Sequence, residues 1–345
     1  MRAAVLREPG DVVIEERPVP RAGPGEVVVR VRAVGVCGSD THYYEHGRIG
    51  RFVVEAPLVL GHEAAGEVTD LGPGVTKLVV GERVSIEPGV ADLTCGQCLA
   101  GRYNLCPNMR FFGTPPVDGA FAEYVVVHEA FAHPVPYSVG DDAAALLEPL
   151  SVGIWACMKA RVTAGSRVLI TGAGPIGLVS VAAALAFGAT EVIVSDVNPV
   201  RLALATELGA TMVIDARAAS VTDLHRSPEV LLECSGHPPA IGEAIRALDR
   251  AGRAVLVGMG GDEILLPLSV IQERELELTG TFRYAGTWPR AIALIASGRI
   301  NLDRLVTGTY RLDQAQEALT AGRRDQRSIK VMIHPQTRQP VRPSR

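Results

Sequence analysis

Residues 172–177 read Gly172-Ala173-Gly174-Pro175-Ile176-Gly177, which fits the pattern G-x-G-x-x-G. The apolar run 167–171 before it predicts a strand, and 175–187 after it predicts a helix. Asp196 lies at the end of the next predicted strand, 24 residues after the first glycine. This order of strand, glycine turn, helix and acid is typical of dinucleotide binding in a doubly wound parallel sheet. The alternative is a glycine-rich turn in an α/β domain without a cofactor.

Each glycine of the motif has a physical reason. Gly172 allows a tight turn, Gly174 lets a pyrophosphate approach backbone N–H groups, and Gly177 lets the helix pack against the strand. The phosphates would then meet the positive end of the helix. Asp196 can accept both ribose hydroxyls of NAD and would repel a 2′-phosphate, whereas Arg201 could pair with that phosphate. The sequence therefore favours NAD over NADP.

The sequence pattern changes near residue 150. After it, short apolar strands alternate with helical patterns, as expected of an α/β domain with a parallel sheet. Before it, short strands lie between Gly and Pro turns, as in 27–34, 66–72, 81–86 and 121–127. These indicate a small, β-rich, barrel-like domain.

A metal site is indicated within this β-rich part. Cys37 is followed 25 residues later by His62 and Glu63. A thiolate, an imidazole and a carboxylate are ligands that a catalytic Zn²⁺ accepts, and a fourth position stays open for water or substrate. The alternative is a buried cysteine in a strand and a His-Glu pair on a loop.

A second cluster has the spacing Cys95-x2-Cys98-x7-Cys106. Three thiolates this close suit a closed tetrahedral Zn²⁺ site, and Asp92 is the candidate for the fourth ligand. A carboxylate is a weaker partner than a thiolate in such a set. The alternative is an empty or partly filled site whose loop is held by packing.

Bulk properties limit the remaining possibilities. The chain has 345 residues, enough for two domains, and a net charge of −4, which argues against a nucleic-acid partner. The most apolar stretch, 175–189, is too short to span a bilayer. No secretory signal is evident, and clustered cysteines without one favour metal over disulfides. We therefore expect a cytoplasmic protein without a membrane partner.

With these features in place, the sequence resembles the zinc-dependent medium-chain alcohol dehydrogenases, and within them the polyol branch of sorbitol and xylitol dehydrogenases. The resemblance covers residues 2 to about 333. The segments that carry it are 34–40, 42–43, 47–50, 60–63, 101–106, 114–119, 147–153, 172–177 and 282–284. Three of these segments point to the polyol branch more narrowly than the others: Gly47-Arg48-Ile49-Gly50, Thr114-Pro115-Pro116 and Phe282-Arg283-Tyr284.

The resemblance implies a GroES-like β-rich catalytic domain, residues 1–150 and 286–345, and a Rossmann cofactor domain, residues 151–285. Cys37, His62 and Glu63 would hold the catalytic zinc, and Glu148 would hydrogen-bond its water. Asp92 stands where members with a structural zinc usually have a cysteine, and some polyol dehydrogenases lack that site. The family forms homotetramers or homodimers.

It also implies the residues that contact the organic ligands. Ser39 and His42 would pass the alcohol proton to solvent, and Glu148 could accept it through water. The substrate site would be lined by Tyr43, Phe111, Glu148, Arg283 and Tyr284, with Phe112 beside Phe111. NAD would contact Gly172, Gly174, Pro175, Ile176, Gly177, Asp196, Arg201, Val257, Gly258, Met259, Thr281, Phe282 and Arg283.

The expected reaction is the oxidation of a polyol to a ketose by hydride transfer to NAD. Two alternatives remain. A threonine 3-dehydrogenase or a diol dehydrogenase would use the same residues on another substrate. A zinc-free, nucleotide-binding structural protein would keep the fold alone, but the presence of Ser39, Cys37, His62 and Glu63 argues against it.

Overall fold

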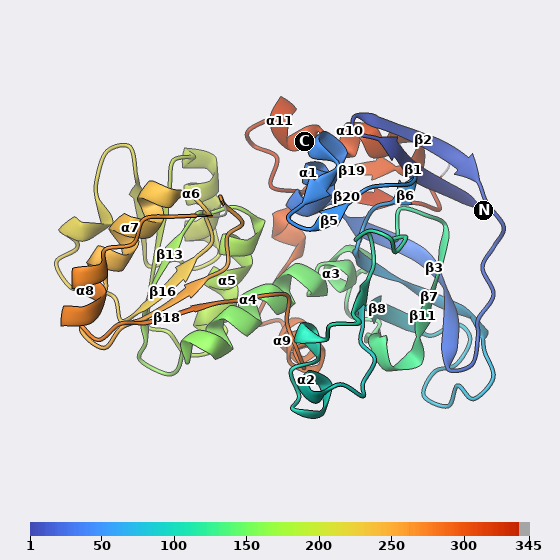
Figure 1. The fold of residues 1–345 in the computed structure, drawn as a ribbon, viewed down its shortest axis with the longest axis horizontal. Coiled ribbons are helices and arrows are strands. Elements are labelled where there is room, and N and C mark those ends of the chain that lie inside the picture. The colour runs from blue at the N-terminus through green and yellow to red at the C-terminus, as the bar shows by residue number, and fades with distance from the viewer. Residues whose placement is uncertain (262, 338–345) are drawn as a thin grey trace. The chain divides into compact units, whose positions relative to one another are not determined.

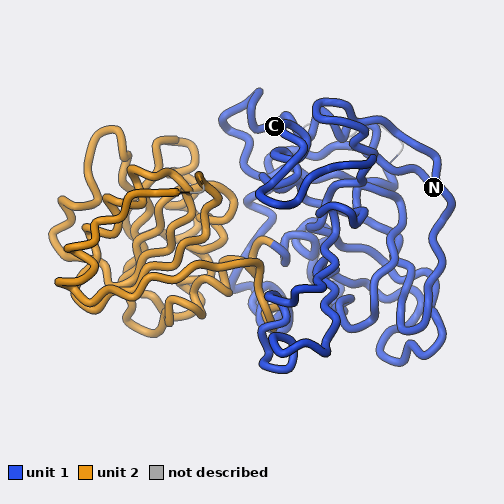
Figure 2. The backbone as a smooth tube through the Cα atoms, in the orientation of Figure 1, with its two compact units in different colours: residues 1–148, 288–345 blue, residues 149–287 orange. Residues whose placement is uncertain are grey.

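The computed structural model describes residues 1–261 and 263–337 of the chain. It forms two compact units (Figure 2). Unit 1 comprises Met1–Glu148 and Trp288–Arg345, and unit 2 comprises Pro149–Thr287. Within the described residues, no helix has both the length and the apolar character needed to cross a bilayer.

Unit 1 is built on a mostly antiparallel seven-stranded sheet (Figure 1). Its path runs β12-β8-β7-β3-β20-β19, and β11 also pairs with β3. The strands are β3 (Glu26–Gly35), β7 (Glu63–Leu71), β8 (Arg83–Ile86), β11 (Tyr124–His128), β12 (Ala132–Pro134), β19 (Val306–Arg311) and β20 (Lys330–His334). The C-terminal strands β19 and β20 therefore complete a sheet that the N-terminal part of the chain begins.

Smaller sheets and short helices complete unit 1. Three strands form the order β2-β1-β6, namely β1 (Arg2–Glu8), β2 (Asp11–Glu16) and β6 (Leu58–Val59). Two-stranded pairs are β4 (Arg48–Ile49) with β5 (Phe52–Val53) and β9 (Gly89–Val90) with β10 (Arg110–Phe111). The helices are α1 (Gly38–His46), α2 (Gly96–Leu99), α3 (Asp141–Ala145), α9 (Trp288–Ala296), α10 (Ala315–Leu319) and α11 (Ala321–Arg324), with short 3₁₀ turns η1 (Tyr103–Leu105), η2 (Glu129–Phe131), η4 (Asp303–Leu305) and η5 (Leu312–Gln314).

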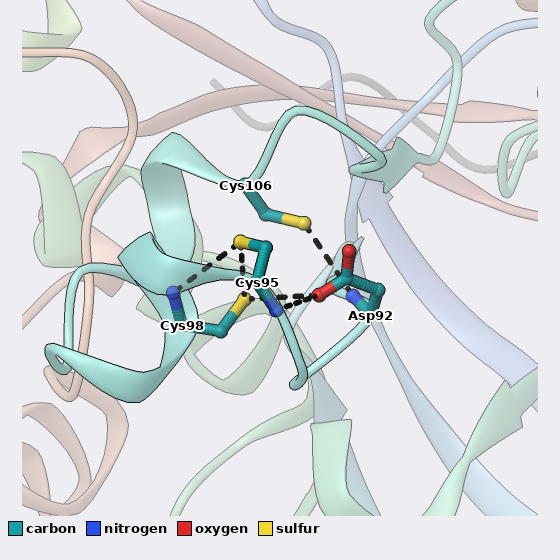
Figure 3. Close-up of side chains that lie close together, drawn as sticks. All are labelled: Asp92, Cys95, Cys98 and Cys106. Atoms are coloured by element: carbon teal, nitrogen blue, oxygen red, sulfur yellow. Dashed lines mark hydrogen bonds between the residues drawn. The ribbon is translucent and has the colours of Figure 1, made fainter.

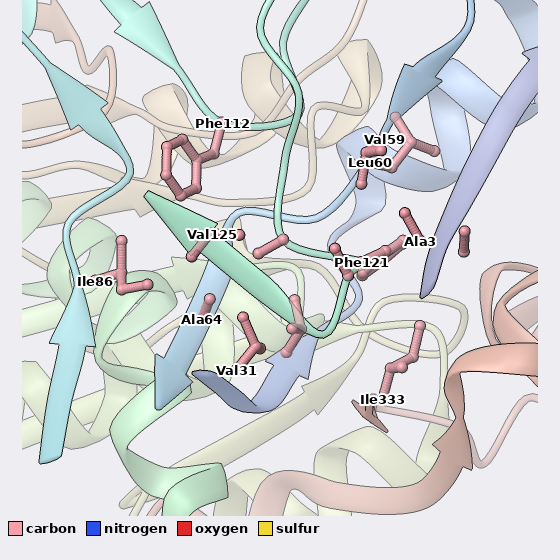
Figure 4. Packing of buried hydrophobic residues seen from close by; sticks show 14 of the residues in the cluster. Ala3, Val31, Val59, Leu60, Ala64, Ile86, Phe112, Phe121, Val125 and Ile333 are labelled. Atoms are coloured by element: carbon pink, nitrogen blue, oxygen red, sulfur yellow. The ribbon is translucent and has the colours of Figure 1, made fainter. Parts of the chain in front are cut away.

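Alternating side chains explain the core of unit 1. Val27, Val29 and Val31 of β3 are fully buried, whereas Arg30 between them is only half-buried. Successive side chains of a strand point to opposite faces, so these valines all face one layer. They belong to the same apolar cluster as Phe121 and Leu60 (Figure 4). This packed layer supports the loops that carry Cys37 and His62.

Unit 2 is a six-stranded sheet whose pairs are all parallel. The order is β15-β14-β13-β16-β17-β18, with β13 (Arg167–Thr171), β14 (Glu191–Asp196), β15 (Met212–Asp215), β16 (Val230–Glu233), β17 (Arg253–Leu256) and β18 (Glu277–Gly280). Its helices are α5 (Pro175–Ala186), α6 (Pro199–Glu207), α7 (Pro238–Ala247) and α8 (Leu268–Glu273), with the 3₁₀ turn η3 (Val221–Asp223); α4 (Leu147–Ala160) begins in unit 1 and continues into unit 2.

The sheet order reverses at β13, the central strand that precedes the glycine motif. All five residues of β13 are buried, as expected for a parallel strand covered by helices on both faces. The prediction of a β-rich part and a doubly wound parallel sheet is confirmed. The predicted helix after residue 174 begins at Pro175, whose fixed backbone angle and missing N–H suit a first helical position.

Candidate functional site

The structure brings Cys37, His62 and Glu63 together. Cys37 precedes α1, and Glu63 is the first residue of β7, opposite Gly35 of β3. One ligand atom from each of the three side chains lies within 4.8 Å of the other two. A thiolate, an imidazole and a carboxylate at this separation fit a divalent zinc ion with one open position.

Asp40 in α1 organises this site, and no sequence pattern predicts this role for it. Its carboxylate is fully buried and accepts the backbone N–H of Cys37 at 2.9 Å and that of Gly61 at 2.9 Å. It also lies 3.5 Å from Nδ1 of His62. One carboxylate therefore fixes both segments that carry the candidate ligands.

Lys330 of β20 is the second residue that sequence reasoning missed. Its Nζ donates to both Glu63 oxygens, at 2.7 and 2.8 Å, and to the carbonyl of Val36 at 2.9 Å. Burial would lower the pKa of this lysine, but the charges of Glu63, Cys37 and Glu148 outweigh burial and raise it. Lys330 is therefore a buried cation at the candidate site.

The imidazole of His62 is perturbed by the same surroundings. Burial would lower the pKa of His62, but Asp40 and Cys37 raise it well above its ordinary value. Asp40 and Cys37 thus favour a positive charge at the ring. A metal ion would supply that charge in place of a proton.

Among the other residues predicted for unit 1, Phe111 and Glu148 interact with residues of this site. The Phe111 ring is 5.6 Å from the His62 ring. Glu148, in the first turn of α4, is buried, and its charge contributes to the raised pKa of Lys330. Tyr43 is buried on α1, and Phe112 belongs to the core cluster. On the same helix, Ser39 is half-buried and His42 is exposed.

The second cluster joins Asp92, Cys95, Cys98 and Cys106 (Figure 3). Asp92 Oδ1 accepts the backbone N–H groups of Thr94 and Cys95 and the thiol of Cys98 at 3.4 Å. The bond from the Cys95 N–H contributes most to a lowered pKa of Asp92. The four residues predicted from spacing thus converge, and the Asp92 carboxylate points toward the sulfur atoms.

In unit 2 the glycine motif has the geometry of a dinucleotide turn. Gly174 precedes α5 directly, and Gly172 has φ +84°. A Cβ on Gly177 would lie 1.8 Å from the Gly172 carbonyl oxygen, so only glycine permits this contact between strand and helix. Asp196 Oδ2 accepts the backbone N–H of Ala173 at 2.6 Å, which places the carboxylate beside the motif.

The remaining residues predicted for the cofactor or substrate also lie in unit 2. Val257 and Gly258 donate their N–H groups to the Glu233 carbonyl, while Met259 is largely exposed. Thr281 donates its N–H to Leu256, the last residue of β17. The guanidinium of Arg283 lies 4.8 Å from the Phe282 ring, and Tyr284 is buried. Ile176 is in the first turn of α5, and Arg201 is in α6.

Comparison with known proteins identifies relatives over almost the whole chain. The family model for the alcohol dehydrogenase GroES-like domain matches residues 23–137, and that for the zinc-binding dehydrogenase domain matches residues 175–297. The sorbitol dehydrogenase of Gallus gallus is 46% identical over 339 residues, covering 96% of this chain and 95% of that protein. The sorbitol dehydrogenase of Bacillus subtilis is 43% identical over 343 residues, covering 97% of each.

The fold is also shared with solved structures. L-idonate 5-dehydrogenase from Escherichia coli superposes with a TM-score of 0.91 and 32% identity, covering 97% of this chain and 98% of that one. The chain belongs to the zinc-dependent medium-chain alcohol dehydrogenases and is an oxidoreductase. Within this family, its whole length resembles the sorbitol dehydrogenases, so the resemblance predicted from the motifs is confirmed.

Proposed function

We propose that this protein oxidises a secondary hydroxyl of a polyol such as xylitol or sorbitol to a ketone, with zinc and NAD. The convergence of Cys37, His62 and Glu63 within 4.8 Å carries this proposal. The dinucleotide turn at Gly172 to Gly177 and the similarity to sorbitol dehydrogenases support it. Unit 1 would be the catalytic domain and unit 2 the cofactor domain.

Cys37, His62 and Glu63 would hold the zinc. Because Nδ1 of His62 faces Asp40, the Nε2 atom would be the ligand. Zinc bound there supplies a Lewis acid that lowers the pKa of a bound alcohol or water. Ser39 is half-buried and His42 is exposed on the same helix, and together they would pass a proton toward solvent. Glu148 would hold the water beside the metal.

Asp196 would determine the choice of cofactor. Its carboxylate sits beside the glycine motif, where it can accept the ribose hydroxyls of NAD. A 2′-phosphate at this position would meet its negative charge. The N-terminus of α5 would hold the pyrophosphate, because the Gly174 segment leaves room for its approach: a Cβ on Gly174 would meet no atom within 4 Å.

Several hydroxyl groups of the substrate would be bound by polar side chains. In unit 1, Tyr43 and Glu148 supply a donor and acceptors suited to a polyhydroxy chain. Phe111, packed against His62, would form an apolar wall. L-idonate 5-dehydrogenase, which shares the fold, is also named for a polyhydroxylated substrate.

Three further features belong to this proposal. Asp92, Cys95, Cys98 and Cys106 would hold a second, structural zinc. The protein would act in the cytoplasm. It would form a homotetramer or homodimer, because β18 is the last strand of the parallel sheet and could pair with a second copy.

Reduction of NAD in the presence of xylitol, sorbitol, threonine or 2,3-butanediol tests the proposal. We expect turnover of one or both polyols by the zinc-loaded protein, and none after Cys37→Ser. Turnover of threonine alone or of the diol alone would contradict the polyol assignment. Full activity of Cys37→Ser would contradict the zinc mechanism.

A further inference from the structure

Lys330 and Glu63 form a buried ion pair next to the candidate zinc ligands. The side chain of Lys330 is 3% exposed and that of Glu63 is fully buried. They come from β20 and β7, which lie on either side of β3 in the sheet. A Cβ on Gly35 of β3 would lie 2.0 Å from Glu63 Oε2. The Glu63 carboxylate therefore occupies the space that a side chain at position 35 would fill.

The ammonium group is fully used in this position. A lysine has three N–H donors, and those of Lys330 reach both Glu63 oxygens and the carbonyl of Val36, the residue before Cys37. Lys330 thus joins the ends of the segments that carry two of the three candidate ligands. Each Glu63 oxygen keeps a lone pair that a metal ion could use.

The Lys330 ammonium group and a zinc ion would compete for the negative charge of Glu63. A buried carboxylate needs a counter-charge, and Lys330 supplies it when no metal is bound. A zinc ion at Cys37, His62 and Glu63 would supply the same counter-charge to the same carboxylate. The ion and the ammonium would then repel each other across one carboxyl group.

We propose that Lys330 lowers the affinity of the candidate site for zinc, because its ammonium group shares the Glu63 carboxylate with the metal ion. The inference rests on the proposed zinc site. Loss of the positive charge leaves zinc to supply the counter-charge of Glu63 and therefore tightens zinc binding. A lysine that merely supported the local packing would have the opposite effect, because its loss would disorder the ligands.

Protection of Cys37 from alkylation at buffered free zinc concentrations tests this directly. Mass spectrometry of the Cys37 peptide reports on this site separately from the peptides of Cys95, Cys98 and Cys106. We compare the wild type with Lys330→Gln, which removes the charge, and Lys330→Arg, which keeps it. Lys77→Gln removes a charge from an exposed turn of the same unit and serves as the matched control.

We expect the free zinc concentration for half-protection of Cys37 to fall at least about tenfold in Lys330→Gln. The variant lacks a positive charge that would otherwise repel the zinc ion from the other side of the Glu63 carboxyl group. Lys330→Arg and Lys77→Gln should stay near the wild type, and the labelling of Cys95, Cys98 and Cys106 should not change. An unchanged or higher value in Lys330→Gln overturns the inference, as does a Lys330→Gln protein that stays unfolded at saturating zinc. If zinc does not protect Cys37 in the wild type, the proposed function itself fails.

Discussion

Two buried or half-buried aspartates act mainly on backbone N–H groups. Asp40 fixes the segments of Cys37 and His62, and Asp196 holds the glycine turn through Ala173. A carboxylate that accepts two N–H groups sets backbone geometry as well as charge. Substitution of Asp40 should therefore affect zinc binding, and substitution of Asp196 should affect cofactor binding.

Asp40→Asn should weaken zinc binding at Cys37 by roughly ten- to a hundredfold, because partners behind metal ligands commonly contribute that much. The amide can no longer accept both the Cys37 and the Gly61 N–H groups. Competition with a chromophoric chelator measures the change. Asp70→Asn, at an exposed position of β7, is the control and should bind zinc as the wild type does. Equal affinities of the two variants would remove Asp40 from this role.

Asp196→Ala should reduce the preference for NAD over NADP by about tenfold or more, because hydrogen bonds to a charged group contribute about 1.5–3 kcal/mol. The neutral side chain no longer binds the ribose hydroxyls or repels a 2′-phosphate. Fluorescence titration of the reduced cofactors measures both dissociation constants. An unchanged ratio would show that another residue reads the ribose.

At the scale of elements, the turn between β13 and α5 contains two glycines with different tasks, Gly177 in packing and Gly174 in cofactor binding. Gly177→Ala should destabilise unit 2 by about 2 kcal/mol, because its Cβ would overlap the Gly172 carbonyl. Gly174→Ala meets no protein atom, so it should fold normally yet bind NAD weakly. Thermal unfolding and NAD titration of the two variants separate the tasks. Equal stability of both variants would contradict the packing explanation.

The thiols of the loop around α2 should differ in their reactivity. The N–H of Cys98 lowers the pKa of Cys95, whereas burial and neighbouring thiols raise the pKa of Cys98 to about 12. In metal-stripped protein at pH 7, Cys95 therefore has the larger thiolate fraction and should react with iodoacetamide before Cys98. Buried Cys157, with its raised pKa, should stay unmodified. Peptide mass spectrometry gives the order, and faster labelling of Cys98 would contradict it.

The elements differ in how far the sequence predicts them. The strand, glycine turn and helix from 167 to 186 can be predicted from local patterns, because the residues that determine the turn and the packing are adjacent in the sequence. The helix α1 after Cys37 was not predicted, since its residues carry almost no amphipathic pattern. Its Asp40 is recognisable only once Gly61 and Cys37 are seen to meet at one carboxylate.

At the scale of the whole molecule, unit 1 is assembled from both ends of the chain. Lys330 reaches Glu63 across 267 residues of sequence, and no local spacing predicts that contact. The candidate ligands themselves were predictable, because thiol, imidazole and carboxylate chemistry limits which residues can serve a metal. Their charge partners were not, because β20 reaches them only through the topology of the sheet.

The central claim is that Cys37, His62 and Glu63 share one zinc ion. Anomalous diffraction at the zinc edge from crystals of the active protein tests it most directly. We predict a peak at about 2.3 Å from Cys37 Sγ and about 2.0–2.2 Å from a His62 nitrogen and a Glu63 oxygen. Active crystals with a peak only among Asp92, Cys95, Cys98 and Cys106, or with none, would contradict the account.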